Sequence, residues 1–204
     1  MVIEDKNVLL TGALRSFGRA QALRRAAAGA RMCLLDRPGH QNGETLAAEV
    51  TNLSGEAATF VGQEPRRLIG RAGRRARPGG ARSRLAKKYG RIVNFCSVTL
   101  NCVIEGYVPF VASNGALYGL TKTLVRGLGG HGIRVHAVSP GAVRSEAEER
   151  VFGDRLQQYS DWALDRQSVK ERMQPEHVAD LAPFLCASES GMITGQNIAI
   201  DGGW

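Results

Sequence analysis

Three residues in the middle of the chain, Ser97, Phe110 and Asn114, have types and spacing that would bring them to one site. Residues four apart lie one above the other on a helix, so Phe110 and Asn114 would share a helix face. Ser97 ends the apolar run that starts at Arg91, which predicts a strand that delivers the serine to the same place. A serine hydroxyl can hydrogen-bond a substrate oxygen, but Phe110 carries no proton to exchange and Asn114 carries no charge.

The N-terminal part of the chain has the pattern of a dinucleotide-binding unit. Asn7–Leu10 predicts a short strand, the turn Thr11-Gly12-Ala13-Leu14-Arg15-Ser16-Phe17-Gly18 follows, and Ala20–Ala28 is rich in helix formers. Gly12 allows the sharp turn and Gly18 lets the helix pack closely on the strand. Ser16 stands where a glycine would let the backbone approach a pyrophosphate, so we expect weakened rather than abolished binding, since a serine can also donate to a phosphate.

A second predicted strand, Arg31–Leu35, ends in Asp36. An acidic residue about 20 positions beyond the glycine turn hydrogen-bonds a ribose hydroxyl and repels a 2′-phosphate, which favours NAD over NADP. Arg15 and Arg37 are cations that would suit NADP, and Asp36 could also be an ordinary solvated loop carboxylate. Both alternatives stay open.

These segments resemble the short-chain dehydrogenase/reductase family. The turn matches its Thr-Gly-x-x-x-Gly-x-Gly motif except at Ser16, and VASNGAL and GLTK match the segment around its active site. The resemblance implies a doubly wound, parallel α/β sheet and an NAD-linked reaction between an alcohol and a carbonyl, closest to that of sugar or polyol dehydrogenases. In the family a tyrosine and a lysine stand at the positions of Phe110 and Asn114, and the serine at Ser97 contacts the substrate oxygen.

The resemblance also implies which residues bind the cofactor. The later ones follow the predicted strand Gly132–Gly141, where relatives contact the nicotinamide carboxamide. The full set is Gly12, Arg15, Ser16, Phe17, Gly18, Asp36, Arg37, Pro140, Gly141, Val143 and Ser145.

Two other phenols lie near the predicted site. Tyr118 and Lys122 form a Tyr-x-x-x-Lys match, but Tyr118 lies ~12 Å along the helix from Phe110 at 1.5 Å per residue. We therefore interpret Tyr118 as a packing residue and Lys122 as a surface residue. Tyr107 is the remaining phenol that could reach the site, from the loop before Phe110.

The middle of the chain departs from the family. Asn42–Leu53 predicts a helix and Ala57–Val61 a third strand. Only a few residues then precede Leu68–Gly73, which resembles a degenerate form of the fourth strand and its turn. A parallel crossover needs about a dozen residues. We therefore expect one domain, residues 1–204, that is internally truncated: residues 64–80 are irregular, the fourth strand is lost or badly paired, and Ala81–Tyr89 is the tail of a helix.

Charge is concentrated in the same region. The net charge is +8, and Pro65–Arg91 holds eleven Lys or Arg residues and no acidic residue. A nucleic-acid surface is one interpretation, but the stretch has one edge aromatic and no recognised motif, so a solvated Arg/Gly-rich segment is favoured. The four cysteines have no metal-ligand spacing, and no membrane span or leader pattern is found, so we expect a cytoplasmic protein without metal.

Beyond the site, Glu146–Val169 predicts a polar helical lid, Glu176–Ala187 a helix opened by Pro175, and Thr194–Gly203 the last strand with its turn. The sequence thus predicts an NAD-linked oxidoreductase of weak activity that acts on a small molecule and forms a weakened homo-oligomer. The alternative is an inactive relative that binds a partner.

Overall fold

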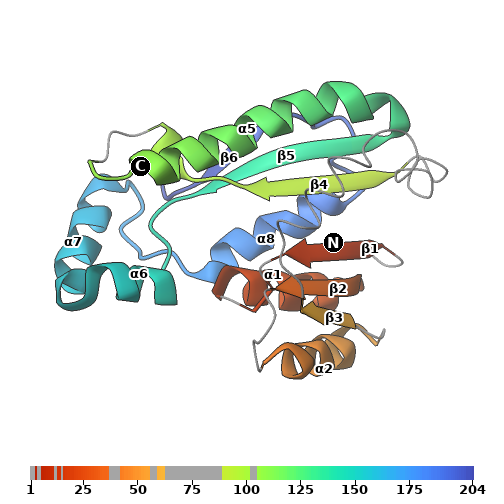
Figure 1. The fold of residues 1–204 in the computed structure, drawn as a ribbon, viewed down its shortest axis with the longest axis horizontal. Coiled ribbons are helices and arrows are strands. Elements are labelled where there is room, and N and C mark those ends of the chain that lie inside the picture. The colour runs from red at the N-terminus through yellow and green to blue at the C-terminus, as the bar shows by residue number, and fades with distance from the viewer. Residues whose placement is uncertain are drawn as a thin grey trace. The chain divides into compact units, whose positions relative to one another are not determined.

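The computed structural model describes residues 3, 6–11, 13–14, 16–36, 42–55, 59–62, 89–101 and 105–204, with only the backbone described at Thr11, Leu35 and 59–62 (Figure 1). The chain forms two compact units. The first comprises Met1–Lys87 and Ala179–Ala187, and the second comprises Lys88–Val178 and Ser188–Trp204.

The first unit is a three-stranded parallel sheet with two helices. Its elements are β1 (Asn7–Thr11), α1 (Ser16–Ala27), β2 (Arg31–Asp36), α2 (Gly43–Ser54) and β3 (Thr59–Gly62), and the strand order is β1-β2-β3. The pairing places Asn7 opposite Arg31 and Cys33 opposite Thr59. Each strand is followed by a helix that returns the chain, which is the repeat of a parallel α/β fold.

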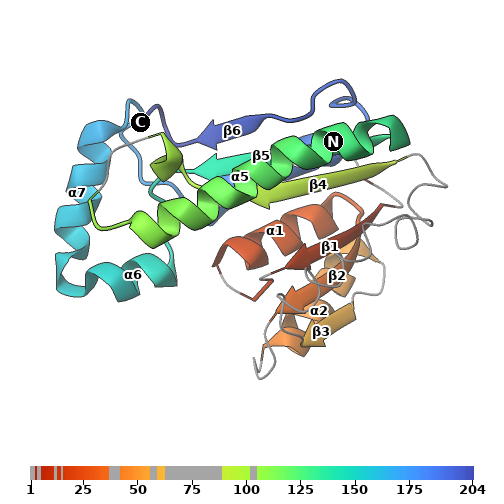
Figure 2. The same ribbon diagram turned by 45° about the horizontal axis from the view of Figure 1, so that its top comes forward.

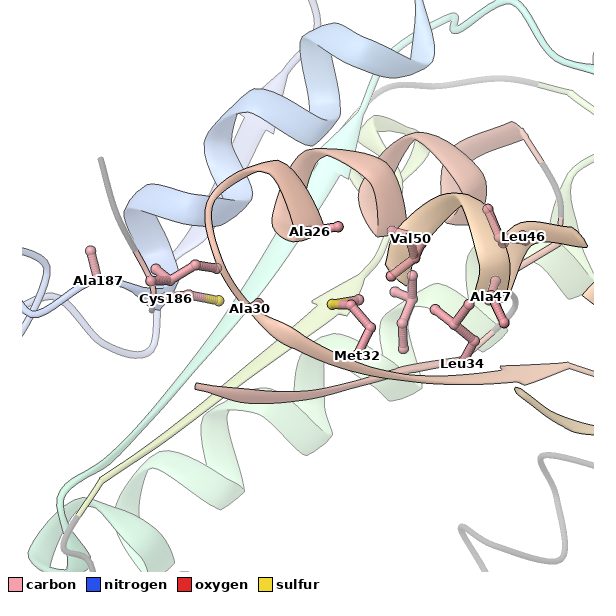
Figure 3. Packing of buried hydrophobic residues seen from close by; sticks show 13 residues of the cluster. Ala26, Ala30, Met32, Leu34, Leu46, Ala47, Val50, Cys186 and Ala187 are labelled. Carbon is pink, nitrogen blue, oxygen red and sulfur yellow. The ribbon is translucent and has the colours of Figure 1, made fainter. Parts of the chain in front are cut away.

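The core of the first unit lies between the sheet and both helices. Met32 and Leu34 of β2 are buried, whereas Arg31 and Cys33 are less so. The two buried side chains lie in one cluster with Leu46, Ala47 and Val50 of α2 (Figure 3). Ala22 and Ala26 of α1 are fully buried. Cys186 and Ala187, at the end of α8 (Pro175–Cys186), complete this cluster.

The second unit has its own parallel sheet, in the order β4-β5-β6. The strands are β4 (Gly90–Phe95), β5 (Ile133–Pro140) and β6 (Asn197–Ile200). The long helix α5 (Val108–Leu128) packs along β4 and β5 (Figure 2). Its second residue is Pro109, which is favoured in the first turn because no backbone donor is needed there.

Short helices complete the second unit on the chain between β5 and β6. α6 (Glu146–Phe152) and the 3₁₀ turn η3 (Gly153–Arg155) lead into α7 (Leu156–Arg166). Ser145 caps α6, since its Oγ accepts a hydrogen bond from the Glu148 amide at 3.2 Å. Gly153 breaks the run with a φ of 49°, a conformation that favours glycine.

The predicted α/β class is confirmed, because both sheets are parallel and helices connect their strands. Several boundaries differ from the predicted ones by one to four residues. β4 ends at Phe95 rather than at Ser97, and the first helix begins at Ser16 rather than at Ala20. The predicted irregular segment at residues 64–80 lies outside the described residues, as does most of the basic stretch. Among the helices that the structure describes, none is both long and apolar enough to cross a membrane.

Candidate active site

Ser97 lies just beyond β4, in extended backbone that ends the strand run. It caps the 3₁₀ turn η1 (Val98–Leu100), since its Oγ accepts a hydrogen bond from the Thr99 amide at 3.2 Å. The side chain is buried, with 9% of the residue exposed. A hydroxyl that accepts one hydrogen bond still has its own proton to donate, so Ser97 can hold a substrate oxygen.

Asn114 lies on the first half of α5 and contacts the segment that holds Ser97. The thiol of Cys96 donates to the Asn114 carbonyl oxygen at 3.6 Å. Burial raises the pKa of the Cys96 thiol, which keeps it protonated and able to donate. The Asn114 side chain is buried and its Nδ2 donates to the Phe110 carbonyl oxygen at 2.8 Å. An amide is uncharged, so Asn114 contributes no charge to the site, and one of its donors is already used within α5.

Phe110 lies in the first turn of α5 and is 47% exposed. Its ring meets the Tyr107 ring edge to face, with 5.8 Å between the ring centroids. Phe110 and Asn114 are one turn apart, and Thr121, two turns beyond Asn114, is fully buried where its hydroxyl accepts from Asn94 of β4 at 2.9 Å. The buried face of α5 thus includes Thr121 and Asn114, whereas Phe110, one turn before Asn114, is half exposed.

Tyr118 and Lys122, the residues of the Tyr-x-x-x-Lys match, are in contact with each other on α5. The Lys122 ammonium lies 5.3 Å from the centre of the Tyr118 ring, and its Nζ donates to the Gly195 carbonyl oxygen at 2.6 Å. The hydrogen bond to Gly195 joins α5 to the loop before β6, and the ring contact lies within α5. The Tyr-x-x-x-Lys match thus has a structural use within this unit.

Asp36 ends β2 in the first unit, beside the turn between β1 and α1. Its Oδ2 accepts a hydrogen bond from the Leu14 amide at 2.9 Å, and the residue is buried. The residue type and its place at a strand end fit the adenosine ribose of a dinucleotide. Ser16 and Phe17 open α1 and Gly18 is buried; Gly12, Arg15 and Arg37 lie outside the described residues.

The predicted cofactor residues of the second unit hold structural positions after β5. Pro140 ends β5, and a Cβ at Gly141 would lie 2.9 Å from the Asp201 Cα, so only glycine fits there. Val143 is buried and bridges to Met173, and Ser145 caps α6. These residues form a tightly packed turn at the strand end, the kind of place where α/β sheets bind ligands.

The sequence did not predict the buried ion pair between Arg172 and Glu148. Arg172 donates through Nη2 to Glu148 Oε1 at 2.5 Å, and the two side chains are 5% and 8% exposed. Burial raises the pKa of Glu148, and the Arg172 charge opposes that rise. Glu148 is one of three acidic residues at the start of a polar helix, and Arg172 lies in a polar loop, so neither position carried a signal.

The parallel strands and the helices that connect them are those of a Rossmann-like α/β fold. A protein-family model described as "Enoyl-(Acyl carrier protein) reductase" matches residues 79–204, more than half of the chain. The chain belongs to the short-chain dehydrogenase/reductase family.

Two relatives show what the chain is similar to. It is 32% identical over 123 residues to gluconate 5-dehydrogenase of Gluconobacter oxydans, a match that covers 60% of this chain and 47% of that protein. It is 35% identical over 119 residues to the 3-oxoacyl-[acyl-carrier-protein] reductase FabG of Thermotoga maritima, covering 58% and 47%. The chain thus spans about half the length of the curated relatives it matches.

Solved structures have the same fold at low identity. A short-chain type dehydrogenase/reductase from Mycobacterium marinum superposes with a TM-score of 0.81 at 22% identity, covering 98% of this chain and 96% of that chain. A 3-oxoacyl (acyl-carrier-protein) reductase from Agrobacterium tumefaciens, solved with NADP bound, gives 0.83 at 18%, covering 100% and 95%. Members of the family use nicotinamide cofactors, NAD or NADP.

Proposed function

We propose that this chain binds NAD(H) and interconverts an alcohol and a carbonyl compound slowly. The observation that carries the proposal is the position of Ser97, which lies at a strand end and is joined through Cys96 to the turn of α5 that holds Asn114. In this arrangement Ser97 is placed to orient the substrate. The site lacks the acid–base group, because Phe110 has no proton to exchange.

The chemistry of the residues limits the rate. A bound nicotinamide supplies the hydride or accepts it. Ser97 can donate its hydroxyl hydrogen to the substrate carbonyl oxygen and so polarise it. The proton that balances hydride transfer must come from water or from Tyr107, whose ring meets that of Phe110, because Phe110 and Asn114 cannot provide it. General acid–base catalysis is worth about 10²–10⁴-fold, so we expect a rate lower by that factor than in a site with a tyrosine.

The cofactor preference rests on Asp36. Its carboxylate at the end of β2 suits two ribose hydroxyls and repels a 2′-phosphate, which favours NAD over NADP. The substrate class is a sugar or polyol, as suggested by the resemblance of the motifs and by similarity to gluconate 5-dehydrogenase.

A second candidate function is partner binding without catalysis. It is favoured by the Asn114 amide, which is buried and bonded to the Phe110 carbonyl where the family has a lysine. A site with no titratable group at either position has no built-in means of moving a proton.

Titration of NADH fluorescence against the whole chain separates the two candidates. Saturable binding, together with hydride transfer that falls at least tenfold in Ser97→Ala, supports the oxidoreductase. Ser113→Ala is a matched control, because Ser113 is an exposed serine on the same helix as Asn114. An absence of saturable NADH binding would reject the oxidoreductase and leave the partner-binding function.

A further inference from the structure

The strand β1 has one edge with which no other strand pairs in the described part of the chain. The first sheet has the order β1-β2-β3, so β1 pairs with β2 on one side only. Its sequence, Asn-Val-Leu-Leu-Thr, contains neither a charged residue nor a proline. Soluble proteins commonly place such residues on sheet edges to prevent pairing with other chains. The free side of β1, which we call the β1 edge, is therefore unguarded.

The pairing of β1 with β2 determines which backbone groups point to the β1 edge. The Arg31 amide donates to the Lys6 carbonyl oxygen at 2.9 Å, so the backbone of Lys6 faces β2. The backbone groups of successive strand residues point to alternate sides, so Val8 and Leu10 also face β2. The alternate residues, which are Asn7, Leu9 and Thr11, therefore direct their N–H and C=O groups to the β1 edge.

Leu9 is an exposed apolar residue at the centre of β1. It is 49% exposed, whereas Leu10 is 7% exposed and packs in the core of the first unit. Side chains alternate between the two faces of a sheet, so Leu9 lies on the face opposite that core, beside Cys33, its partner in the register. Strands of parallel sheets are normally covered on both faces. Leu9 thus joins outward-directed backbone groups to an apolar side chain that is half exposed.

The residue types of β1 have the same order of polarity from either end. Asn7 and Thr11 are polar, Val8 and Leu10 are apolar, and Leu9 is at the centre. When two copies of β1 are placed antiparallel about Leu9, Asn7 lies opposite Thr11, Val8 opposite Leu10, and Leu9 opposite Leu9. Opposite residues of an antiparallel pair share a face, and those whose backbone groups face each other exchange two hydrogen bonds. This register gives the outward groups of Asn7, Leu9 and Thr11 partners and brings no like charges together.

We propose that the β1 edge binds the β1 edge of a second copy of this chain, antiparallel and in this register. The two copies then share one sheet, in which each Leu9 side chain contacts the other. A second copy is favoured over an unrelated protein because β1 matches itself residue by residue about a two-fold axis, the commonest symmetry of dimers. The inference goes beyond the proposed oxidoreductase function, because it requires association alone and uses no residue around Ser97.

Sedimentation equilibrium of the full chain over a range of concentrations tests the association. We expect the parent chain to dimerise. Leu9→Lys and Leu9→Glu should each raise the Kd of the dimer at least about tenfold, because each places two like charges opposite one another. An equimolar mixture of these two variants should recover the dimer, because an ammonium then lies opposite a carboxylate. Recovery requires that position 9 of one copy lies beside position 9 of the other, and it also shows that both variants are folded.

Leu53→Lys is the matched control. Leu53 is 52% exposed on α2, so the same change is made at nearly the same exposure but away from β1, and the Kd should not change. A parent chain that stays monomeric at every concentration would overturn the proposal. A dimer that persists unchanged in Leu9→Lys would also overturn it, because such a dimer forms through another face. Failure of the Lys/Glu mixture to recover the dimer would reject the register. None of these outcomes depends on the NADH titration, so the two proposals can fail separately.

Discussion

The Asn114 side chain donates its Nδ2 hydrogen to the carbonyl oxygen of Phe110, one turn earlier on α5, at 2.8 Å. The two residues at which the sequence motifs predict the positions of the family's tyrosine and lysine are therefore bonded to each other through the helix backbone. The bond satisfies a buried amide that would otherwise need another partner. It also means that the two positions should be changed together.

The first prediction concerns catalysis. The double change Phe110→Tyr, Asn114→Lys should raise the rate of NAD-linked alcohol oxidation by about 10²–10⁴-fold, because a phenol would be supplied together with an ammonium that lowers its pKa. The measurement is NADH formation at 340 nm with a panel of polyols. Phe110→Leu, Asn114→Lys is the control that lacks the phenol. If the Tyr/Lys variant binds NADH and stays inactive, the defect lies elsewhere in the chain.

The second prediction concerns the Tyr-x-x-x-Lys match. Lys122→Met should lower the free energy of unfolding by about 1 kcal/mol, since it removes a charged hydrogen bond to Gly195 and a cation–π contact at a partly exposed site. It should leave turnover unchanged. Urea unfolding and the activity assay check both points, with Arg126→Met on the same helix as control. Loss of turnover at unchanged stability would mean that Lys122 is part of the catalytic site.

The third prediction concerns cofactor choice. Asp36→Asn removes the charge but keeps an oxygen that can accept from the Leu14 amide. NADH should then bind several-fold more weakly, because a charged acceptor is lost. NADPH should bind more tightly, because repulsion of the 2′-phosphate is lost. Competition between the two cofactors measures the ratio. Glu44→Gln, at an exposed site on α2, is the control, and an unchanged ratio in Asp36→Asn would show that Asp36 does not contact the ribose.

The fourth prediction concerns His136, which is fully buried on β5. Burial lowers the pKa of His136 below its ordinary value of 6.5, and the Arg91 charge lowers it further. As the pH falls, His136 therefore takes up a proton in the unfolded chain before it does so in the folded chain. The stability that neutral His136 contributes is fully present above about pH 6.5 and is lost progressively below it. The loss should approach about 1.4 kcal/mol per pH unit.

Urea unfolding between pH 7.5 and 5.5 at constant ionic strength tests this slope. His136→Leu should flatten it, whatever its effect at neutral pH. His131→Leu, at an exposed position, should not. Equal slopes in the parent and in His136→Leu would assign the pH dependence to other groups.

The sequence predicted the fold where pattern and local chemistry agree. The apolar run Arg31–Leu35 predicted a strand, and Pro175 before a helical pattern predicted a helix start, and the structure has both. The membership in the family was also predicted from its motifs, and is confirmed. The roles of the residues around Ser97 and Asp36 stay predictions that the experiments above address.

The rest depended on contacts that sequence spacing does not encode. Ser16 was expected to lie in the turn, but it starts α1. Glu148 and Arg172 are 24 positions apart in polar segments, and only the folding of α6 against the later loop brings them together and buries them. A charge pair of this kind looks like ordinary surface in a sequence, because its burial is decided by tertiary packing.

The core of the first unit includes Cys186 and Ala187 together with Ala26 and Ala30 (Figure 3). During synthesis Ala26 and Ala30 leave the ribosome more than 150 residues ahead of Cys186. The N-terminal sheet must therefore wait for most of translation before its hydrophobic cluster can close, and contacts so distant in sequence slow folding. A nascent chain halted before residue 186 would expose that cluster and should be captured by chaperones or cut by proteases more readily than the finished chain.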